Sequence, residues 1–193
     1  MGLVAAFTSP ADHRWDASLG GYVTTFLIKN IILVIFIIIV IGESVQYKKW
    51  WDESDMGSSS GDGPQDFWVR IGIYLVPDLV LTLVMLVFIP KRWWHPITAL
   101  VTSILWFGLW LCACFFNILL IESNEIPFDN VRQWYNWGYA EGTFQALIAV
   151  MYVIMMVFAA HAVHRWRMRP SRNAVEEGTA TVLKVVSQRT SVS

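Results

Sequence analysis

The chain has few of the residues on which soluble enzymes and secreted proteins are usually built. Only 15% of its 193 residues are charged, and it contains two cysteines and no N-x-S/T sequon. Cys112 and Cys114 lie in one apolar stretch, where two positions along a helix point to different sides and so cannot pair. The chain also lacks a phosphate-binding loop, an H-E-x-x-H sequence and a nucleophile–base arrangement. These absences argue against a disulfide scaffold and an enzyme, and we expect no cofactor and no nucleic-acid partner.

Long apolar stretches are what the chain has instead. Hydrophobic residues make up 55% of it, and the run Ile31–Ile41 contains no polar residue at all. A helix needs about 20 mostly apolar residues to cross the hydrocarbon core of a bilayer. Four stretches meet this length, near residues 22–45, 68–90, 96–121 and 143–166. The sequence therefore predicts an all-α membrane protein, a bundle of four transmembrane helices over residues 22–168. Residues 1–21 and 169–193 are then tails, and the second is expected to be disordered.

The basic residues predict the orientation of these helices. With the N-terminus in the cytoplasm, nine lysines and arginines lie on the inner side and three in the outer loops, 43–67 and 122–142. This bias fits the positive-inside rule, so both termini are predicted to be cytoplasmic. Trp15, Trp93, Trp94 and Trp166 would form an aromatic belt at the inner surface. Glu43 and Glu141 fall in the outer loops. The inner basic residues that would anchor this topology or contact lipid headgroups include Lys91, Arg92, Arg165, Arg167, Arg169 and Arg172.

Asp78 is the most informative polar residue of the predicted spans. Insertion of such a carboxylate at the centre of a helix costs roughly 2.5–3.5 kcal/mol. Three interpretations remain open: a proton or ion site; a neutral acid that hydrogen-bonds Asn30, Thr82 or another helix; and an ion pair with Lys29. The depths of Lys29 and Asp78 differ by roughly 8 Å at 1.5 Å per residue, which a lysine side chain nearly bridges. Asn117 is a further intramembrane polar residue that a transport site would use.

Three histidines are weak candidates for a metal site. His161 and His164 share one face of the fourth predicted helix, and His95 precedes the third helix on the same side of the membrane. Imidazoles at such spacings can bind a metal ion. The alternative is that they simply accompany the arginines at the lipid headgroups, which is the interpretation we adopt.

The stretch R-W-W-H-P-I-T-A-L-V-T-S-I-L-W-F-G-L-W (92–110) and the last helix, Y-A-E-G-T-F-Q-A-L-I-A-V-M-Y to H-A-V-H-R-W-R (139–167), are similar in texture to the last two helices of MARVEL-type tetraspan proteins. The resemblance, to uncharacterised fungal members, covers about residues 22–168. It implies a non-enzymatic role in organising membrane domains or vesicle traffic, through lipids, other membrane proteins or self-association. Helix length favours the plasma membrane over endomembranes. The alternative function is a small transporter, channel or accessory subunit that uses Asp78 with Lys29 or Asn117.

Overall fold

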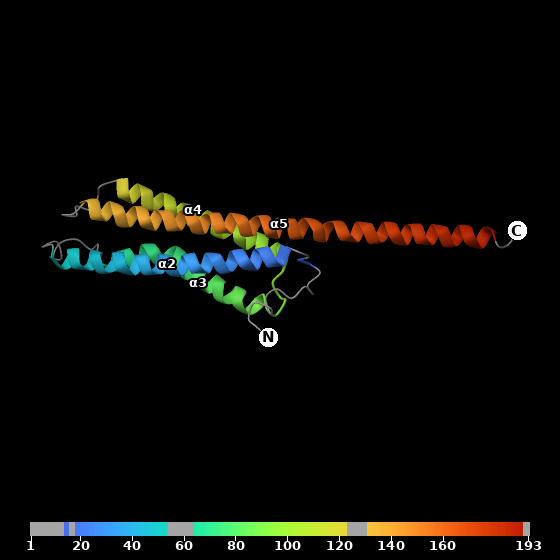
Figure 1. Cartoon of the computed structure of the whole chain (residues 1–193), viewed down its shortest axis with the longest axis horizontal. Helices are drawn as coiled ribbons and strands as arrows, with labels where there is room; N and C mark the ends of the chain where they lie inside the picture. The colour runs from blue at the N-terminus through green and yellow to red at the C-terminus, as the bar shows by residue number, and fades with distance from the viewer. Residues whose placement is uncertain (1–13, 16–17, 54–63, 123–130, 191–193) are drawn as a thin grey trace.

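Four long helices account for nearly all of the structure (Figure 1). The computed structural model describes residues 14–15, 18–53, 64–122 and 131–190, and only the backbone at residues 50, 53, 64–66, 131, 133 and 169–190. The helices are α2 (Ser18–Glu53), α3 (Pro64–Phe88), α4 (Pro96–Glu122) and α5 (Val131–Thr190). Each contains a segment long and apolar enough to cross a membrane: 18–49, 67–88, 96–122 and 134–168. The predicted all-helical architecture with four such helices is therefore confirmed.

The helices form a bundle in which each lies beside its neighbours in sequence. α5 packs most extensively against α4 and then against α2, while α3 contacts α2 and α4 more sparingly. The contact between α2 and α5 closes the ring. The start of α2 and the projecting part of α5 lie at the same end of the bundle (Figure 1). This arrangement agrees with an even number of crossings, which would place both ends of the helical domain on one side of a membrane.

α2 shows how the sequence builds this core. A row of its buried side chains recurs every three or four residues from Tyr22 to Glu43, which is the spacing of a helix that packs along one stripe. Polar side chains occupy some of these positions, among them Lys29 and Glu43. The other faces carry exposed aliphatic residues such as Ile31, Val34 and Ile38. Exposure of so many large apolar side chains suits contact with lipid and would be unusual in water.

Two helices are longer than their apolar stretches predict. α2 continues to Glu53 instead of residue 45, and α5 begins at Val131 instead of residue 143. α5 also continues as a helix to Thr190, whereas the sequence predicts a disordered tail from residue 169. The predicted ends of each helix were placed where the hydropathy of the sequence falls. The backbone hydrogen bonds of a helix do not require apolar side chains, so a helix can extend beyond its apolar stretch. Most of the N-terminal tail, residues 1–13, lies outside the described residues.

A tight turn joins α3 to α4. Trp93 N donates to Phe88 O at 3.1 Å and Arg92 N donates to Ile89 O at 3.0 Å, the pair of bonds of a Schellman cap. Arg92 has a φ of 59°, the left-handed conformation in which this cap usually holds glycine. α4 then begins at Pro96, and the Nδ1 atom of His95 accepts a hydrogen bond from Ile97 N at 3.2 Å. A side-chain cap followed by proline at the first position is a strong helix start.

Candidate functional site

An ion pair lies in the middle of the bundle. The ammonium group of Lys29 on α2 is 3.1 Å from Oδ1 of Asp78 on α3, and the two residues are 1% and 0% exposed. Of the three interpretations left open by the sequence, the structure shows the ion pair. The same ammonium group also donates to Thr82 Oγ1 at 3.0 Å and contacts Tyr152 OH at 3.5 Å. The ammonium group therefore has three protein oxygens within hydrogen-bond distance.

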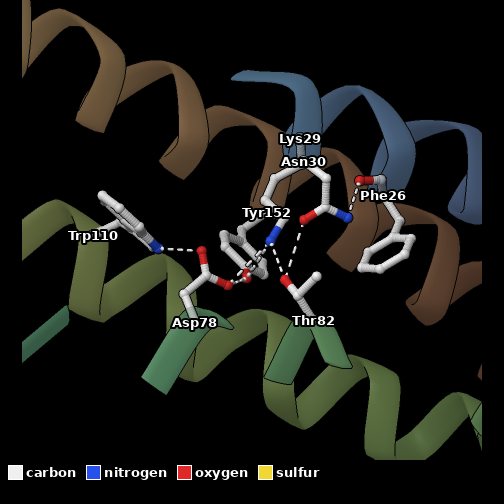
Figure 2. A network of polar contacts seen from close by, with 7 residues as sticks. All are labelled: Phe26, Lys29, Asn30, Asp78, Thr82, Trp110 and Tyr152. Carbon is white, nitrogen blue, oxygen red and sulfur yellow. Dashed lines mark hydrogen bonds and ion pairs between the residues drawn. The ribbon is translucent and has the colours of Figure 1, made fainter. Parts of the chain in front are cut away.

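The surrounding side chains bring all four helices into one network, here called the Lys29 network (Figure 2). Trp110 Nε1 on α4 donates to Asp78 Oδ2 at 3.2 Å, and Tyr152 OH on α5 donates to Asp78 Oδ1. Thr82 donates in turn to Asn30 Oδ1 at 3.1 Å. Both carboxylate oxygens of Asp78 are thus satisfied by groups of the protein. A buried polar network that is fully satisfied fixes the relative positions of the helices that contribute to it.

The energetic role of this ion pair follows from its burial. A buried ion pair is often no better for stability than well-packed apolar residues, because desolvation offsets the attraction between the charges. Loss of one partner is costly, since it leaves an uncompensated charge inside the bundle. A shift of α2 against α3 by one helical turn would separate the two charges, so the ion pair favours the observed register of these helices.

A second buried polar group lies farther along the bundle, and we call it the Glu43 cluster. It consists of Glu43 on α2, Arg70 and Tyr74 on α3, and Glu141 and Gln145 on α5. Arg70 Nη2 is 3.3 Å from Glu141 Oε2 and 3.7 Å from Glu43 Oε1. Tyr74 OH donates to Glu141 Oε1 at 2.8 Å, and Gln145 Nε2 donates to the same oxygen at 2.7 Å. Two acids and one base therefore meet in one buried site.

Three aromatic rings lie between the Lys29–Asp78 ion pair and the charged groups of the Glu43 cluster, and two of them, Trp110 and Tyr74, also belong to these polar groups. Phe36, Tyr74 and Trp110 are all buried, and their ring centroids are 5.1 to 6.3 Å apart. On α2, Phe36 is seven residues from both Lys29 and Glu43, so it lies about 10 Å along the helix from each. We call these three rings the aromatic layer. Its members touch both polar groups, since Trp110 binds Asp78 and Tyr74 binds Glu141.

A cavity of about 360 Å³ lies beside the Glu43 cluster, between α3, α4 and α5. Apolar side chains such as Ile73, Leu109 and Phe116 form much of its wall, and Arg70, Glu141 and Gln145 also line it. Asn117, one of the predicted site residues, lines this cavity as well. It donates to Gly138 O at 3.0 Å and does not join the Lys29 network. Asn117 therefore bonds α4 to α5.

The three histidines have different contacts and do not form one site. His161 Nδ1 hydrogen-bonds Ser18 Oγ at 2.9 Å, and the ring of His95 packs edge-on against Trp166 at 5.2 Å. His164 is exposed on α5. Within the described parts of the chain, no three metal-ligating side chains come together.

The predicted basic and aromatic belts occupy different environments. Lys91, Arg92, Arg165 and Arg167 are exposed, and the packing of His95 on Trp166 brings the α3–α4 turn close to this part of α5. The side chains of Arg169 and Arg172 lie outside the described set. Trp15 and Trp94, predicted for the surface belt, are buried instead. Trp15 Nε1 donates to Trp94 O at 2.9 Å, and Trp94 Nε1 donates to Tyr22 OH at 3.2 Å. These indoles reach bundle partners, so they do not need the lipid surface.

Several site residues were not predicted from the sequence. Glu43 and Glu141 were assigned to the outer loops, whereas they lie within α2 and α5 and are 2% and 1% exposed. Arg70 inside a span, and Glu141 and Gln145 four apart on one helix face, were the signals of a buried cluster. Trp110 and Tyr152 gave no such signal, because aromatic residues inside apolar helices usually only pack.

Comparison with known proteins does not assign the chain to a family. The chain matches no protein-family model, no curated protein and no solved structure.

Proposed function

We propose that this protein is a non-enzymatic, multi-pass membrane protein that organises membrane domains or vesicle traffic through helix packing and contacts with lipids or other membrane proteins. The observation that carries the proposal is the Lys29 network. Lys29 contacts oxygens of Asp78, Thr82 and Tyr152, and both oxygens of Asp78 accept hydrogen bonds from neighbouring helices. Charges paired in this way favour a structural role, because they bond the helices of the bundle to one another.

The exterior supports a role in lipid and protein contacts. Along the spans, α2, α3 and α4 present rows of exposed aliphatic and aromatic side chains, including Ile38, Leu83 and Phe116. At one end, Lys91, Arg92, Arg165 and Arg167 lie exposed around the α3–α4 turn and the last span. Near an anionic bilayer surface, each such residue contributes about 1 kcal/mol. This end is the cytoplasmic one in our proposal, and the favoured location is the plasma membrane.

The resemblance to MARVEL-type tetraspan proteins belongs to the same proposal. A bundle of four antiparallel helices with a tight basic turn and both ends on one side is the arrangement that this resemblance implies. The proposed topology can be tested in a chain that lacks Cys112 and Cys114. An impermeant thiol reagent added outside cells should label Ser59→Cys but not Ser191→Cys, and the opposite pattern would invert the proposed orientation.

Single-molecule tracking of the tagged protein in its own membrane tests the function. We expect slow, confined molecules gathered in patches. Replacement of Lys91, Arg92, Arg165 and Arg167 by glutamine should raise the mobile fraction, because the contacts with anionic lipid are lost. The control replaces Lys48 and Lys49, which lie near the end of α2 farthest from the α3–α4 turn, by glutamine. This change should leave the mobile fraction unchanged. Freely diffusing single copies of the unchanged protein would contradict the proposal.

The second candidate function is a small transporter, channel or accessory subunit. The cavity beside the Glu43 cluster favours it, since Arg70, Glu141 and Gln145 line a space between three helices. Asp78 was the residue first suggested for this function, and its place in a satisfied network now argues against it. Ion or proton flux into vesicles reconstituted with the protein would test this function. A flux that is absent from protein-free vesicles and is abolished by Glu141→Gln would establish transport.

A further inference from the structure

The charges of the Glu43 cluster do not balance. Glu43 and Glu141 supply two carboxyl groups, and Arg70 supplies one guanidinium group. If both acids were ionised, one negative charge would remain without compensation among side chains that are 2% and 1% exposed. An uncompensated buried charge costs several kcal/mol, so the site favours uptake of one positive charge.

The two carboxyl groups differ sharply in their donors. Glu141 accepts from Tyr74 at 2.8 Å, from Gln145 at 2.7 Å and from Arg70 at 3.3 Å. In the described part of the chain, neither oxygen of Glu43 accepts a hydrogen bond, and Arg70 approaches it only to 3.7 Å. Donors stabilise a carboxylate, so Glu141 is the better anion of the two. A proton that enters the cluster is therefore held by Glu43.

We propose that the Glu43 cluster is a proton-binding site, in which Glu43 holds one proton beside the ionised Glu141–Arg70 pair. The proton adds to a carboxylate oxygen of Glu43, and no bond breaks in the protein. The groups that face this site are Glu43 from α2, Arg70 and Tyr74 from α3, and Glu141 and Gln145 from α5. Among the described residues that line the adjacent cavity, α4 contributes Cys112 and Asn117 but no charged group.

The cavity gives the cluster a connection to the surface of the bundle. Arg70, Tyr74, Glu141 and Gln145 line it at one side. Cys112 and Phe116, which also line it, are exposed on α4. The cavity thus lets a small apolar reagent approach the Arg70, Glu141 and Gln145 side of the cluster from the bundle surface, and Glu43 lies behind these residues. The proposal extends beyond the membrane-organising function and does not depend on it.

Dicyclohexylcarbodiimide, an apolar reagent that modifies protonated carboxyl groups, tests the proposal on the full chain in lipid nanodiscs. The modified residue is identified by mass spectrometry of peptides. An ordinary glutamate is protonated in about one molecule in 500 at pH 7. We expect Glu43 to be labelled at pH 7 about a hundredfold faster than the exposed Glu122, and the labelling to fall as pH rises. Asp78, paired with Lys29, is the buried control and should stay unlabelled.

Two variants should shift the pH dependence of Glu43 labelling in opposite directions. Glu141→Gln removes the competing negative charge, so Arg70 balances Glu43 and labelling should move to lower pH. Arg70→Gln removes the positive charge, so Glu43 should stay protonated and labelled at higher pH. A merely structural role of the cluster would not move the pH profile in both directions. If a variant does not fold, the pH profile of the unchanged chain still decides.

Three results would overturn the proposal. The first is an unlabelled Glu43 throughout the range from pH 6 to 8, about the physiological range. The second is labelling of Glu141 in place of Glu43. The third is protection of Glu43 by sodium chloride, but not by choline chloride of equal ionic strength, which would assign the site to a metal cation instead of a proton.

Discussion

The ion pair between Lys29 and Asp78 allows a sharp test of how the bundle is held together. Asp78→Asn removes the negative charge but leaves Lys29, 1% exposed, with its ammonium group inside the bundle. Loss of one partner of a buried pair costs about 3–5 kcal/mol. The new amide also has a nitrogen that cannot accept from Trp110 or Tyr152, which now both donate to the carboxylate. We therefore expect a loss of about 4 kcal/mol in the free energy of unfolding.

The reverse change should be milder. Lys29→Met leaves the Asp78 carboxylate without its counter-ion but with two donors, Trp110 and Tyr152, so a loss at the lower end of that range, about 3 kcal/mol, is expected. The double variant contains neither charge, and it should recover at least about 2 kcal/mol relative to the sum of the single losses. Unfolding by dodecyl sulfate in mixed micelles, followed by circular dichroism, measures all three. Asp52→Asn, on the exposed end of α2, is the control and should stay within about 0.5 kcal/mol.

Two outcomes would refute this reasoning. If Asp78→Asn resembled the Asp52→Asn control, the carboxyl group would be neutral in the native bundle. If the double variant were as unstable as the sum of its parts, the two charges would not interact.

Three further predictions use the same unfolding assay. A Cβ atom at Gly21 would lie 2.5 Å from the ring of Phe158, so Gly21→Ala should cost about 1–3 kcal/mol, whereas Gly20→Ala, with nothing within 4 Å, should cost nothing. Arg92→Gly should stabilise the chain by about 1 kcal/mol, because it relieves the left-handed conformation at the end of α3, and no gain would mean that the turn is unstrained. Trp110→Phe keeps a ring in the aromatic layer but removes the donor to Asp78 Oδ2. It should cost about 1–3 kcal/mol, and much less in the Asp78→Asn background if that bond is the cause.

The architecture followed from sequence because each helix carries enough apolar residues to be recognised alone. The depth of Lys29 and Asp78 could also be counted along their helices, which made their pairing one of the stated alternatives. Which partners converge on them could not be counted, because Trp110 and Tyr152 reach Asp78 only through the packing of α4 and α5 against α3.

The Glu43 cluster was missed for a different reason. Glu43 and Glu141 follow or precede apolar stretches, so hydropathy assigned them to loops. In the structure, α2 and α5 continue past those points as helices, and Glu43 is the last residue of the buried stripe of α2. The spacing of seven residues that joins Lys29, Phe36 and Glu43 was present in the sequence. The spacing can be recognised only if polar residues are counted among the buried positions of the helix.

The aromatic layer has a consequence for the membrane in which the bundle would sit. A pore that leaks protons needs a file of water or of polar groups that continues from one face to the other. Here Phe36, Tyr74 and Trp110 pack against one another between the two pairs of charges. The phenyl ring of Phe36 offers no group that can pass a proton on. We therefore expect lipid vesicles that contain the protein to keep an imposed proton gradient.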